Sequence, residues 1–126
     1  MNIDRLDHLV LTVKDIQSTC DFYSRVLGMQ VVIFGEERKA LVFGQQKINL
    51  HQIGKEFEPK ANKPTSGSAD LCLIVRESLS YVEQHLRCCG VEIISGPIER
   101  TGAMGAIASL YIRDPDLNSI ELSVYL

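Results

Sequence analysis

The hexapeptide HLVLTV, His8–Val13, decides the fold because it has a counterpart later in the chain, DLCLIV, at Asp70–Val75. Both segments are followed by the same features: a stretch of helical length, a glycine, and a short apolar run, which reads GMQVV in the first half and GVEII in the second. A repeat of this kind predicts a fold built from two related supersecondary units. With 126 residues, the chain is long enough to bury a core as one compact domain.

Each half contains one predicted amphipathic helix. Apolar residues recur with a period of about 3.6 residues over Asp15–Leu27 and over Glu77–Cys89. Gly28 and Gly90 follow these two segments directly. A glycine just after the last periodic residue is a common helix end, so both helices are expected to stop there.

Strands fill the rest of each half, which gives the order β-α-β-β-β twice and predicts the α+β class. The glycine-rich stretch GPIERTGAMGA is expected to be a loop, either a plain connector or a segment that closes a ligand cleft. A polar linker is expected at Gly54–Ser68, so one domain of residues 1–126 would comprise module one at 1–53 and module two at 69–126. The predicted strands are His8–Val13, Met29–Phe34, Arg38–Phe43, Lys47–Ile53, Asp70–Val75, Val91–Ser95, Ala106–Arg113 and Asn118–Val124.

The composition narrows the range of partners and compartments. The net charge is −3 and no basic stripe is present, so neither nucleic acid nor an anionic membrane surface is an expected partner. The N-terminus lacks the layout of a signal peptide, and no apolar run has the length of a membrane span. The four cysteines show no zinc-finger or CxxC spacing, which favours reduced thiols in a cytoplasmic protein.

Strand alternation places four ionisable residues on the sheet faces that point away from the helices. His8 and Asp70 open the first strand of each half, while His51 and Glu121 lie in the last strand of each half. His51 is expected to hold in the first half the place that Glu121 holds in the second. Each residue alone reads as an ordinary solvated strand residue, but together they form a plausible ligand set. Two imidazoles and two carboxylates suit nickel, zinc, cobalt, manganese or iron(II).

Three segments, LDHLVLTVKDI, FYSRVLGM and RDPDLNSIEL, resemble the vicinal oxygen chelate superfamily, which comprises glyoxalases, bleomycin-resistance proteins and dioxygenases. The middle segment, ERKALVFGQQKINLHQIGKEFEPK, is similar to the subgroup called glyoxalase domain-containing protein 5. The resemblance implies a cupped, eight-stranded mixed sheet around a cleft, with the helices on its convex side.

The same resemblance implies one divalent metal per site, bound by residues of the first and last strand of each module. Carried over to this sequence, the ligands are His8, His51, Asp70 and Glu121. The sequence also departs from the pattern of glyoxalase I, which typically has a glutamate where His51 stands and a histidine or glutamine where Asp70 stands. The departure weakens the transfer of any one named activity.

The sequence is consistent with three functions. The leading one is a metal-dependent lyase or isomerase that acts on a small oxygenated substrate through a metal-stabilised enolate. Glu121, or His51 if it binds no metal, would move the proton, and Arg38 and Arg100 are available to bind substrate carboxylates, although solvated surface arginines are the more common reading. The alternatives are an iron(II)-dependent ring-cleaving dioxygenase and a non-catalytic, antibiotic-sequestering binding protein. A homodimer with shared sites is expected, with the modules pairing within one chain or between two.

Overall fold

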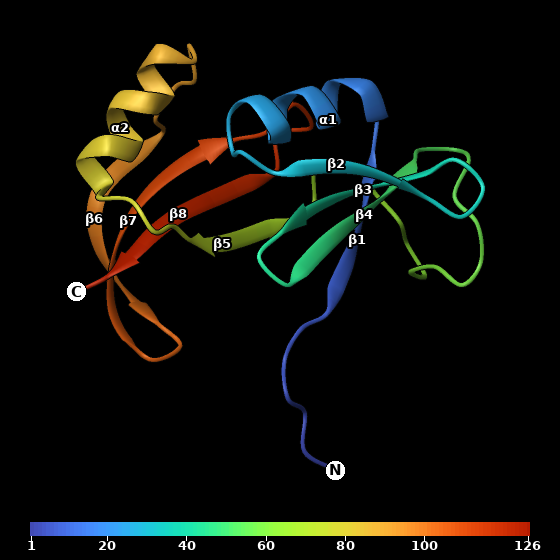
Figure 1. Ribbon diagram of the computed structural model, residues 1–126, viewed down its shortest axis with the longest axis horizontal. Helices are drawn as coiled ribbons and strands as arrows, with labels where there is room; N and C mark the ends of the chain where they lie inside the picture. Colours follow the sequence, from blue (N-terminus) through green and yellow to red (C-terminus); the bar gives the residue numbers. More distant parts are fainter. The chain divides into compact units, whose positions relative to one another are not determined.

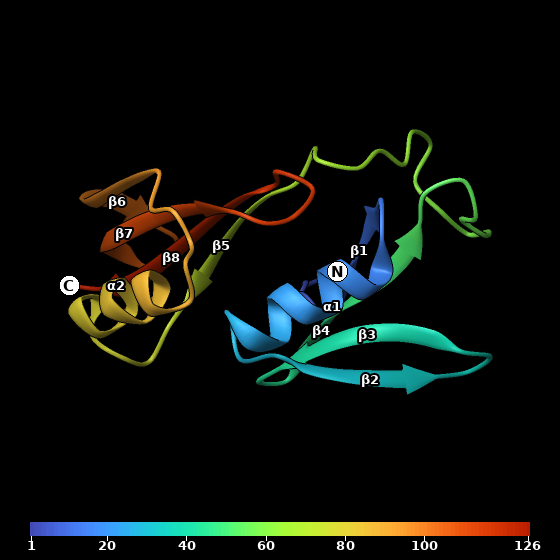
Figure 2. The same ribbon diagram turned by 90° about the horizontal axis from the view of Figure 1, so that it is seen from above.

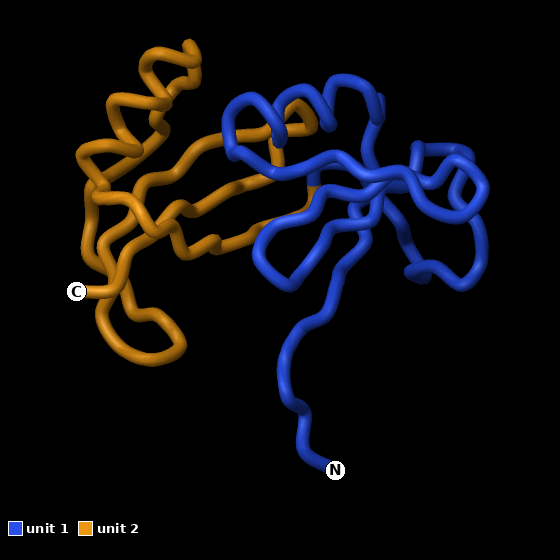
Figure 3. Tube along the Cα trace, in the orientation of Figure 1, with its two compact units in different colours: residues 1–67 blue, residues 68–126 orange.

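A computed structural model describes all 126 residues of the chain (Figure 1). The chain divides into two compact units, Met1–Gly67 and Ser68–Leu126, which Figure 3 shows in blue and orange. The boundary lies near the C-terminal end of the predicted linker, 54–68. Unit 1 contains β1 (His8–Val13), α1 (Ile16–Arg25), β2 (Gln30–Phe34), β3 (Arg38–Phe43) and β4 (Gln46–Gln52). Unit 2 contains β5 (Asp70–Ile74), α2 (Leu79–Cys88), β6 (Ser95–Gly102), β7 (Gly105–Arg113) and β8 (Ser119–Tyr125).

Each unit is one βαβββ module, so the predicted α+β class is confirmed. The strand order is β1-β4-β3-β2 in one sheet and β5-β8-β7-β6 in the other. In both sheets the first and last strands pair in parallel and the remaining pairs are antiparallel. The eight strands thus lie in two separate four-stranded sheets, and the implied eight-stranded sheet is not continuous.

The core of unit 1 lies between α1 and one face of its sheet (Figures 1 and 2). Asp15 begins the helix because its carboxylate accepts hydrogen bonds from the Ser18 amide at 3.0 Å and the Ser18 hydroxyl at 2.6 Å. The helix buries Tyr23 completely, and Leu41 and Ile48 of the sheet are equally buried. This burial leaves the opposite sheet face available for ligands.

Unit 2 is built in the same way, with α2 covering β7. Ser78 begins this helix by accepting a hydrogen bond from the Tyr81 amide at 3.2 Å. Leu86 of the helix, Leu110 of β7 and Ile120 of β8 have no exposed surface. The alternation predicted for the last strand therefore places Ile120 on the helix side and its neighbour Glu121 on the other face, called here the open face of unit 2.

The structure corrects the prediction for the segment after α2. Residues 91–94 form no strand, and the stretch expected to be a loop is β6 and the start of β7. Gly96 and Pro97 suggested a loop, but β6 pairs only with β7, and an edge strand tolerates proline. The two residues fall where the register is irregular, between Ser95 and Ile98. A Cβ on Gly96 would lie 2.3 Å from the carbonyl oxygen of Ser109, so the close approach of the two strands requires glycine.

No helix of the structure has the length and apolar character needed to cross a membrane.

Candidate functional site

The open face of unit 2 brings the candidate base Glu121 into one row with two other side chains. In the strand register, Glu121 of β8 lies beside Cys72 of β5 on one side and beside Tyr111 of β7 on the other. The next row on the same face contains Ser109 and Ser123, which are both fully buried. The parallel pairing of β5 with β8 is what places a residue near position 70 beside one near position 120.

A chain of hydrogen bonds runs through these rows and ends on Glu121. The Ser109 hydroxyl donates to Glu121 Oε1 at 2.7 Å, and its oxygen lies 2.7 Å from the hydroxyl of Ser123. The Ser123 oxygen lies 3.3 Å from the sulfur of Cys72. Each hydroxyl has a single proton, so Ser109 must accept from Ser123, and Ser123 must accept from the thiol. With Ser109 donating to Glu121, the bonds run in one direction, from Cys72 toward the carboxylate.

The state of the Cys72 thiol agrees with this direction. Burial is the main cause that raises the pKa of Cys72. The charge of Glu121, a hydrogen bond to its carboxylate and the charge of Asp70 raise this pKa further, against the opposing effect of the Ser123 hydrogen bond. A thiol with a raised pKa keeps its proton near neutral pH and can donate it in a hydrogen bond. Consecutive bonds of one direction polarise each other, so the chain holds Glu121 as an oriented acceptor.

Glu121 borders a cavity of about 390 Å³ whose lining comes entirely from unit 2. The lining includes Cys72, Arg100, Ile107, Tyr111 and Tyr125, and Glu121 is its one carboxylate. A volume of this size lies at the small end of the range for ligand pockets. The cavity therefore offers a carboxylate, a guanidinium and two phenol rings to a small molecule.

In unit 1, His8 is held by its neighbour in the sequence. Its Nδ1 lies 2.8 Å from Oδ1 of Asp7, and 46% of its side chain is exposed. The hydrogen bond to His8 is the largest cause that lowers the pKa of Asp7. A carboxylate bound to one imidazole nitrogen leaves the other nitrogen as a ligand, which is the usual arrangement of metal-binding histidines.

His51 lies in a different environment, buried beneath an aromatic ring. Its ring centroid is 4.4 Å from that of Phe57, and the guanidinium of Arg38 lies 4.3 Å from the same Phe57 centroid. Phe57, from the segment after β4, therefore contacts both sequence-predicted residues of unit 1. The arrangement fixes the imidazole and the guanidinium through ring stacking and cation–π attraction.

The register corrects the expected equivalence of His51 and Glu121. Val10 pairs with Asn49 in unit 1 just as Cys72 pairs with Glu121 in unit 2, so the counterpart of Glu121 is Asn49. His51 corresponds to Ser123, two residues further along. A shift of two residues keeps the side chain on the same face, so His51 still lies on the face opposite α1.

The sequence analysis did not identify Asn49. An alignment of INL at 48–50 with IEL at 120–122 would have placed Asn49 opposite Glu121. The Oδ1 of Asn49 is buried and is the one buried side-chain oxygen or nitrogen without a hydrogen-bond partner. Buried polar atoms are nearly always paired, so an unpaired one marks a place where a ligand group can be accommodated.

The four predicted metal ligands fall into two pairs, one in each unit. His8 and His51 belong to unit 1, and Asp70 and Glu121 belong to unit 2, so neither unit by itself brings three of them together. Asp70 is exposed at the start of β5 and does not line the cavity of Glu121. No group of three or more His, Cys, Asp or Glu side chains forms a metal-binding cluster in the structure. By donor type, the nitrogen and oxygen atoms present fit a divalent metal.

The sequence and the fold are similar to those of known proteins. The chain matches the Glyoxalase/Bleomycin resistance protein/Dioxygenase superfamily over residues 5–122. It is 58% identical to virulence protein STM3117 of Salmonella typhimurium over 100% of this chain and 88% of that protein. The crystal structure of STM3117 superimposes with a TM-score of 0.99 and covers 100% of both chains. Glyoxalase domain-containing protein RDO1 of Mycosarcoma maydis is 56% identical over 99% of this chain and 70% of that protein.

More distant solved structures share the fold alone. The lactoylglutathione lyase of Agrobacterium tumefaciens has a TM-score of 0.76 at 19% identity, with 98% of this chain and 96% of that one covered. The antibiotic-binding protein TnmS3 of a Streptomyces species has a TM-score of 0.77 at 20% identity, with 100% and 99% covered. Proteins with this fold thus include one named as an enzyme and one named as a binding protein.

Proposed function

The chain belongs to the Glyoxalase/Bleomycin resistance protein/Dioxygenase superfamily, and from this premise we propose that it is a metal-dependent lyase or isomerase for a small oxygenated substrate. One observation carries the proposal: Glu121 is the single carboxylate on the lining of a cavity of about 390 Å³, and the buried Ser109 fixes one of its oxygens. A positioned carboxylate beside a small-molecule cavity is suited to take a proton from a carbon and return it to a neighbouring one.

The proposed metal ligands are His8, His51, Asp70 and Glu121, with nickel, zinc, cobalt, manganese and iron(II) as the candidate ions. The donor types support this choice, and so does the Asp7 carboxylate that orients His8. A divalent metal, when bound, supplies positive charge that stabilises negative charge developing on a nearby substrate oxygen. The exposed and oriented imidazole of His8 makes it the best suited of the four to capture an ion.

Proton transfer is assigned to Glu121 rather than to His51. His51 is buried and stacked on Phe57, which suits a fixed ligand better than a group that must reach a substrate carbon. Glu121 lines the cavity directly, and the hydrogen bond from Ser109 occupies only one of its two carboxylate oxygens. Two catalytic roles were predicted, for Glu121 and His51, and the geometry favours the first.

Substrate binding is assigned to the two predicted arginines. Arg100 lines the cavity of Glu121, and its Nε donates to the Tyr111 hydroxyl at 3.1 Å. Arg38 lies in unit 1 against Phe57. Both guanidiniums are held by an aromatic residue, which reduces the conformational entropy lost when they bind an anion.

The assembly and the compartment are part of the same proposal. Because each unit contributes two donors, a complete ligand set needs one unit of each kind, from one chain or from two, and we propose a homodimer with shared sites. The four cysteines form no disulfide, which supports a cytoplasmic location. The name of the relative RDO1 supports a closer grouping with glyoxalase domain-containing proteins, of which protein 5 is the proposed subgroup.

The test is elemental analysis of protein purified without added metal, followed by an activity screen with each of the five ions. The first substrate to try is the hemithioacetal of glutathione and methylglyoxal, and Glu121→Gln is the diagnostic variant. Its matched control is Glu99→Gln, which alters an exposed carboxylate on β6 of the same sheet. Activity that needs a metal and Glu121 but not Glu99 supports the proposal.

Two results would select the alternatives. Oxygen uptake with iron(II) and a catechol, dependent on His8, would indicate a ring-cleaving dioxygenase. Absence of metal together with tight binding of an aromatic antibiotic would indicate a sequestering protein.

A further inference from the structure

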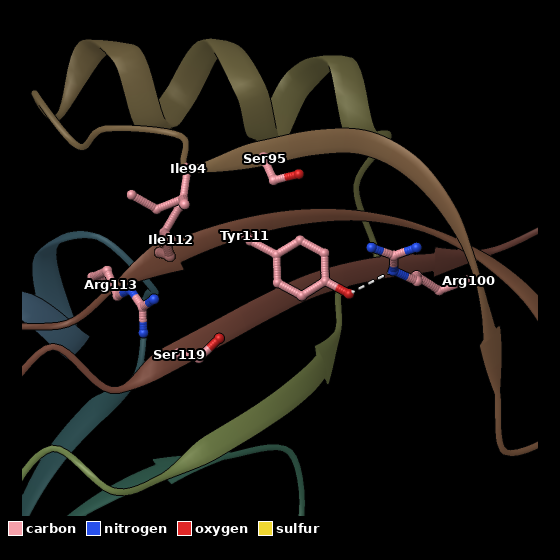
Figure 4. Close-up of a pocket in the computed structure, with 7 residues that line it drawn as sticks. All are labelled: Ile94, Ser95, Arg100, Tyr111, Ile112, Arg113 and Ser119. Carbon is pink, nitrogen blue, oxygen red and sulfur yellow. Dashed lines mark hydrogen bonds between the residues drawn. The ribbon is translucent and has the colours of Figure 1, made fainter.

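A second cavity, of about 230 Å³, lies on the open face of unit 2 beside the one that contains Glu121. Arg100 and Tyr111 line both cavities. Ser95, Arg113 and Ser119 line only the second. Figure 4 shows the Tyr111 ring between the two arginines, with Arg113 on one side and Arg100 on the other.

The lining of this second cavity contains two guanidinium groups and no carboxylate. Neither Arg100 nor Arg113 forms an ion pair, whereas Arg5, Arg25 and Arg87 each lie against an aspartate or a glutamate. Two positive charges at one small hollow repel each other unless an anion lies between them. Their positive charge is therefore available to a ligand.

Uncharged contacts hold both arginines in place. Arg100 donates from Nε to the Tyr111 hydroxyl, and its guanidinium carbon lies 5.7 Å from the centroid of that ring. Arg113 donates from Nη1 to the carbonyl oxygen of Leu117 at 3.2 Å, in the turn before β8. Each contact uses a single N–H group, so several N–H donors remain on each side chain for bonds to an anion.

Serine hydroxyls from the neighbouring strands add further donors. Ser95 pairs with Tyr111 in the register, and Ser119 pairs with Arg113, so both serines lie on the same face as the arginines. Figure 4 shows both side chains at the cavity. Guanidinium groups combined with hydroxyls are the donor set that proteins use for carboxylate and phosphate oxygens.

We infer that this cavity is an anion subsite that binds a carboxylate or phosphate group of a small ligand. Because Arg100 and Tyr111 also line the cavity of Glu121, the anionic group would be bound next to the place where the rest of the ligand meets the carboxylate. The substrate class is thus a small organic acid or phosphate ester whose reacting carbon lies in the larger cavity. The position of the reacting carbon rests on the proposed function, while the subsite itself depends on unit 2 alone and needs no metal.

The experiment is an amide NMR titration of the metal-free protein in the presence of a chelator. Inorganic phosphate and succinate are added separately at constant ionic strength, with chloride as the reference anion. The expected result is a saturable shift of the amides of Ser95, Tyr111 and Ser119. The variants Arg100→Gln and Arg113→Gln should each weaken binding by roughly tenfold, the effect of one lost charge-assisted hydrogen bond.

Control variants separate the subsite from general attraction to positive charge. Arg87→Gln removes an arginine that is paired with Glu83 on α2 and should leave binding unchanged. Arg113→Lys keeps the charge but loses the planar fork, so it should bind more weakly than the wild type and more tightly than Arg113→Gln. Tighter binding of succinate would identify a carboxylate ligand, and tighter binding of phosphate would identify a phosphate ester.

Two outcomes would overturn the inference: shifts that do not saturate, or equal affinity in the wild type and in folded Arg100→Gln and Arg113→Gln variants. Because no metal is present, a failure here is distinct from a failure of the proposed enzyme activity, which is measured with the metal-loaded protein.

Discussion

The two units share a strand order and a helix position, yet their faces opposite the helices contain different chemistry. In unit 1 that face contains a buried imidazole, His51, and the unpaired amide oxygen of Asn49. In unit 2 it contains a hydrogen-bonded carboxylate, Glu121, which lines one of two cavities, and two arginines without ion pairs. The two units therefore share a scaffold, while the positions with equivalent register, Asn49 and Glu121, carry groups of different charge.

The largest difference in stability between the two units is expected from a glycine on the edge strand β6. Gly96→Ala places a Cβ 2.3 Å from the Ser109 carbonyl at a φ of +101°, and the free energy of unfolding should fall by about 3 kcal/mol. Gly28→Ala in unit 1 has a φ of +69° and nothing within 4 Å, so its loss should be about 1–2 kcal/mol. Denaturant unfolding measures both. Equal losses would show that the contact between β6 and β7 is not the strained feature that distinguishes unit 2.

A smaller effect is expected from Ser109, the serine that donates a hydrogen bond to Glu121. Ser109→Ala removes the donor to Glu121 and leaves the buried hydroxyl of Ser123 without its acceptor, which should cost about 1–3 kcal/mol of unfolding free energy. Ser24→Ala is the control in unit 1, because the Ser24 hydroxyl bonds an exposed carbonyl oxygen of Asp21. Denaturant unfolding of both variants compares them. If Ser109→Ala is as stable as Ser24→Ala, the chain of hydrogen bonds contributes nothing to the fold of unit 2.

The thiol at the start of that chain should have a spectroscopic signature with little effect on stability. Because Cys72 donates to Ser123, its S–H stretching band in the infrared should shift when Ser123 is replaced by alanine. Cys72→Ala removes the S–H group and so identifies its band, while Cys88→Ser identifies the band of a thiol outside this chain of hydrogen bonds for comparison. A Cys72 band that is identical in the wild type and in Ser123→Ala would contradict the assigned direction of the bonds.

The smallest effect is expected at the N-terminal caps of the two helices, which should differ in how acid affects the protection of their amides. Hydrogen bonds from Ser18 lower the pKa of Asp15, which begins α1, whereas the cap of α2 is Ser78, which does not ionise in this range. A carboxylate with a lowered folded-state pKa contributes stability that is fully present above the unfolded value and is lost as the pH falls through the folded value. Below a pH of about 4 the Ser18 amide should exchange faster with solvent, while the Tyr81 amide keeps its protection. Equal loss of protection at both amides would contradict this difference between the units.

Much of the fold could be predicted because its signals are local. The apolar period before Gly28 and Gly90 predicted both helices, and strict alternation placed Glu121 opposite the buried Ile120. The strand β6 was missed because glycine and proline at 96 and 97 resemble a loop, and only the pairing with β7 shows that they lie on a sheet edge.

The candidate site was harder to predict because it depends on register. Parity tells which face a side chain occupies but does not distinguish positions two residues apart, so His51 was equated with Glu121 and Asn49 was overlooked. The cavities beside Tyr111 arise from side chains of four strands, β5 to β8, whose contacts no local pattern encodes.

The most direct test of the metal-dependent function is a calorimetric titration of the demetallated protein with nickel and zinc, alongside the variants His8→Ala and Glu121→Gln. We predict binding of about one divalent ion per chain that weakens in acid, since the histidines must be neutral to bind. Each variant should bind at least about 100-fold more weakly, because each removes a proposed ligand that lies off the packed core. Equal affinity in the wild type and both variants, with all three proteins folded, would contradict the proposed metal centre.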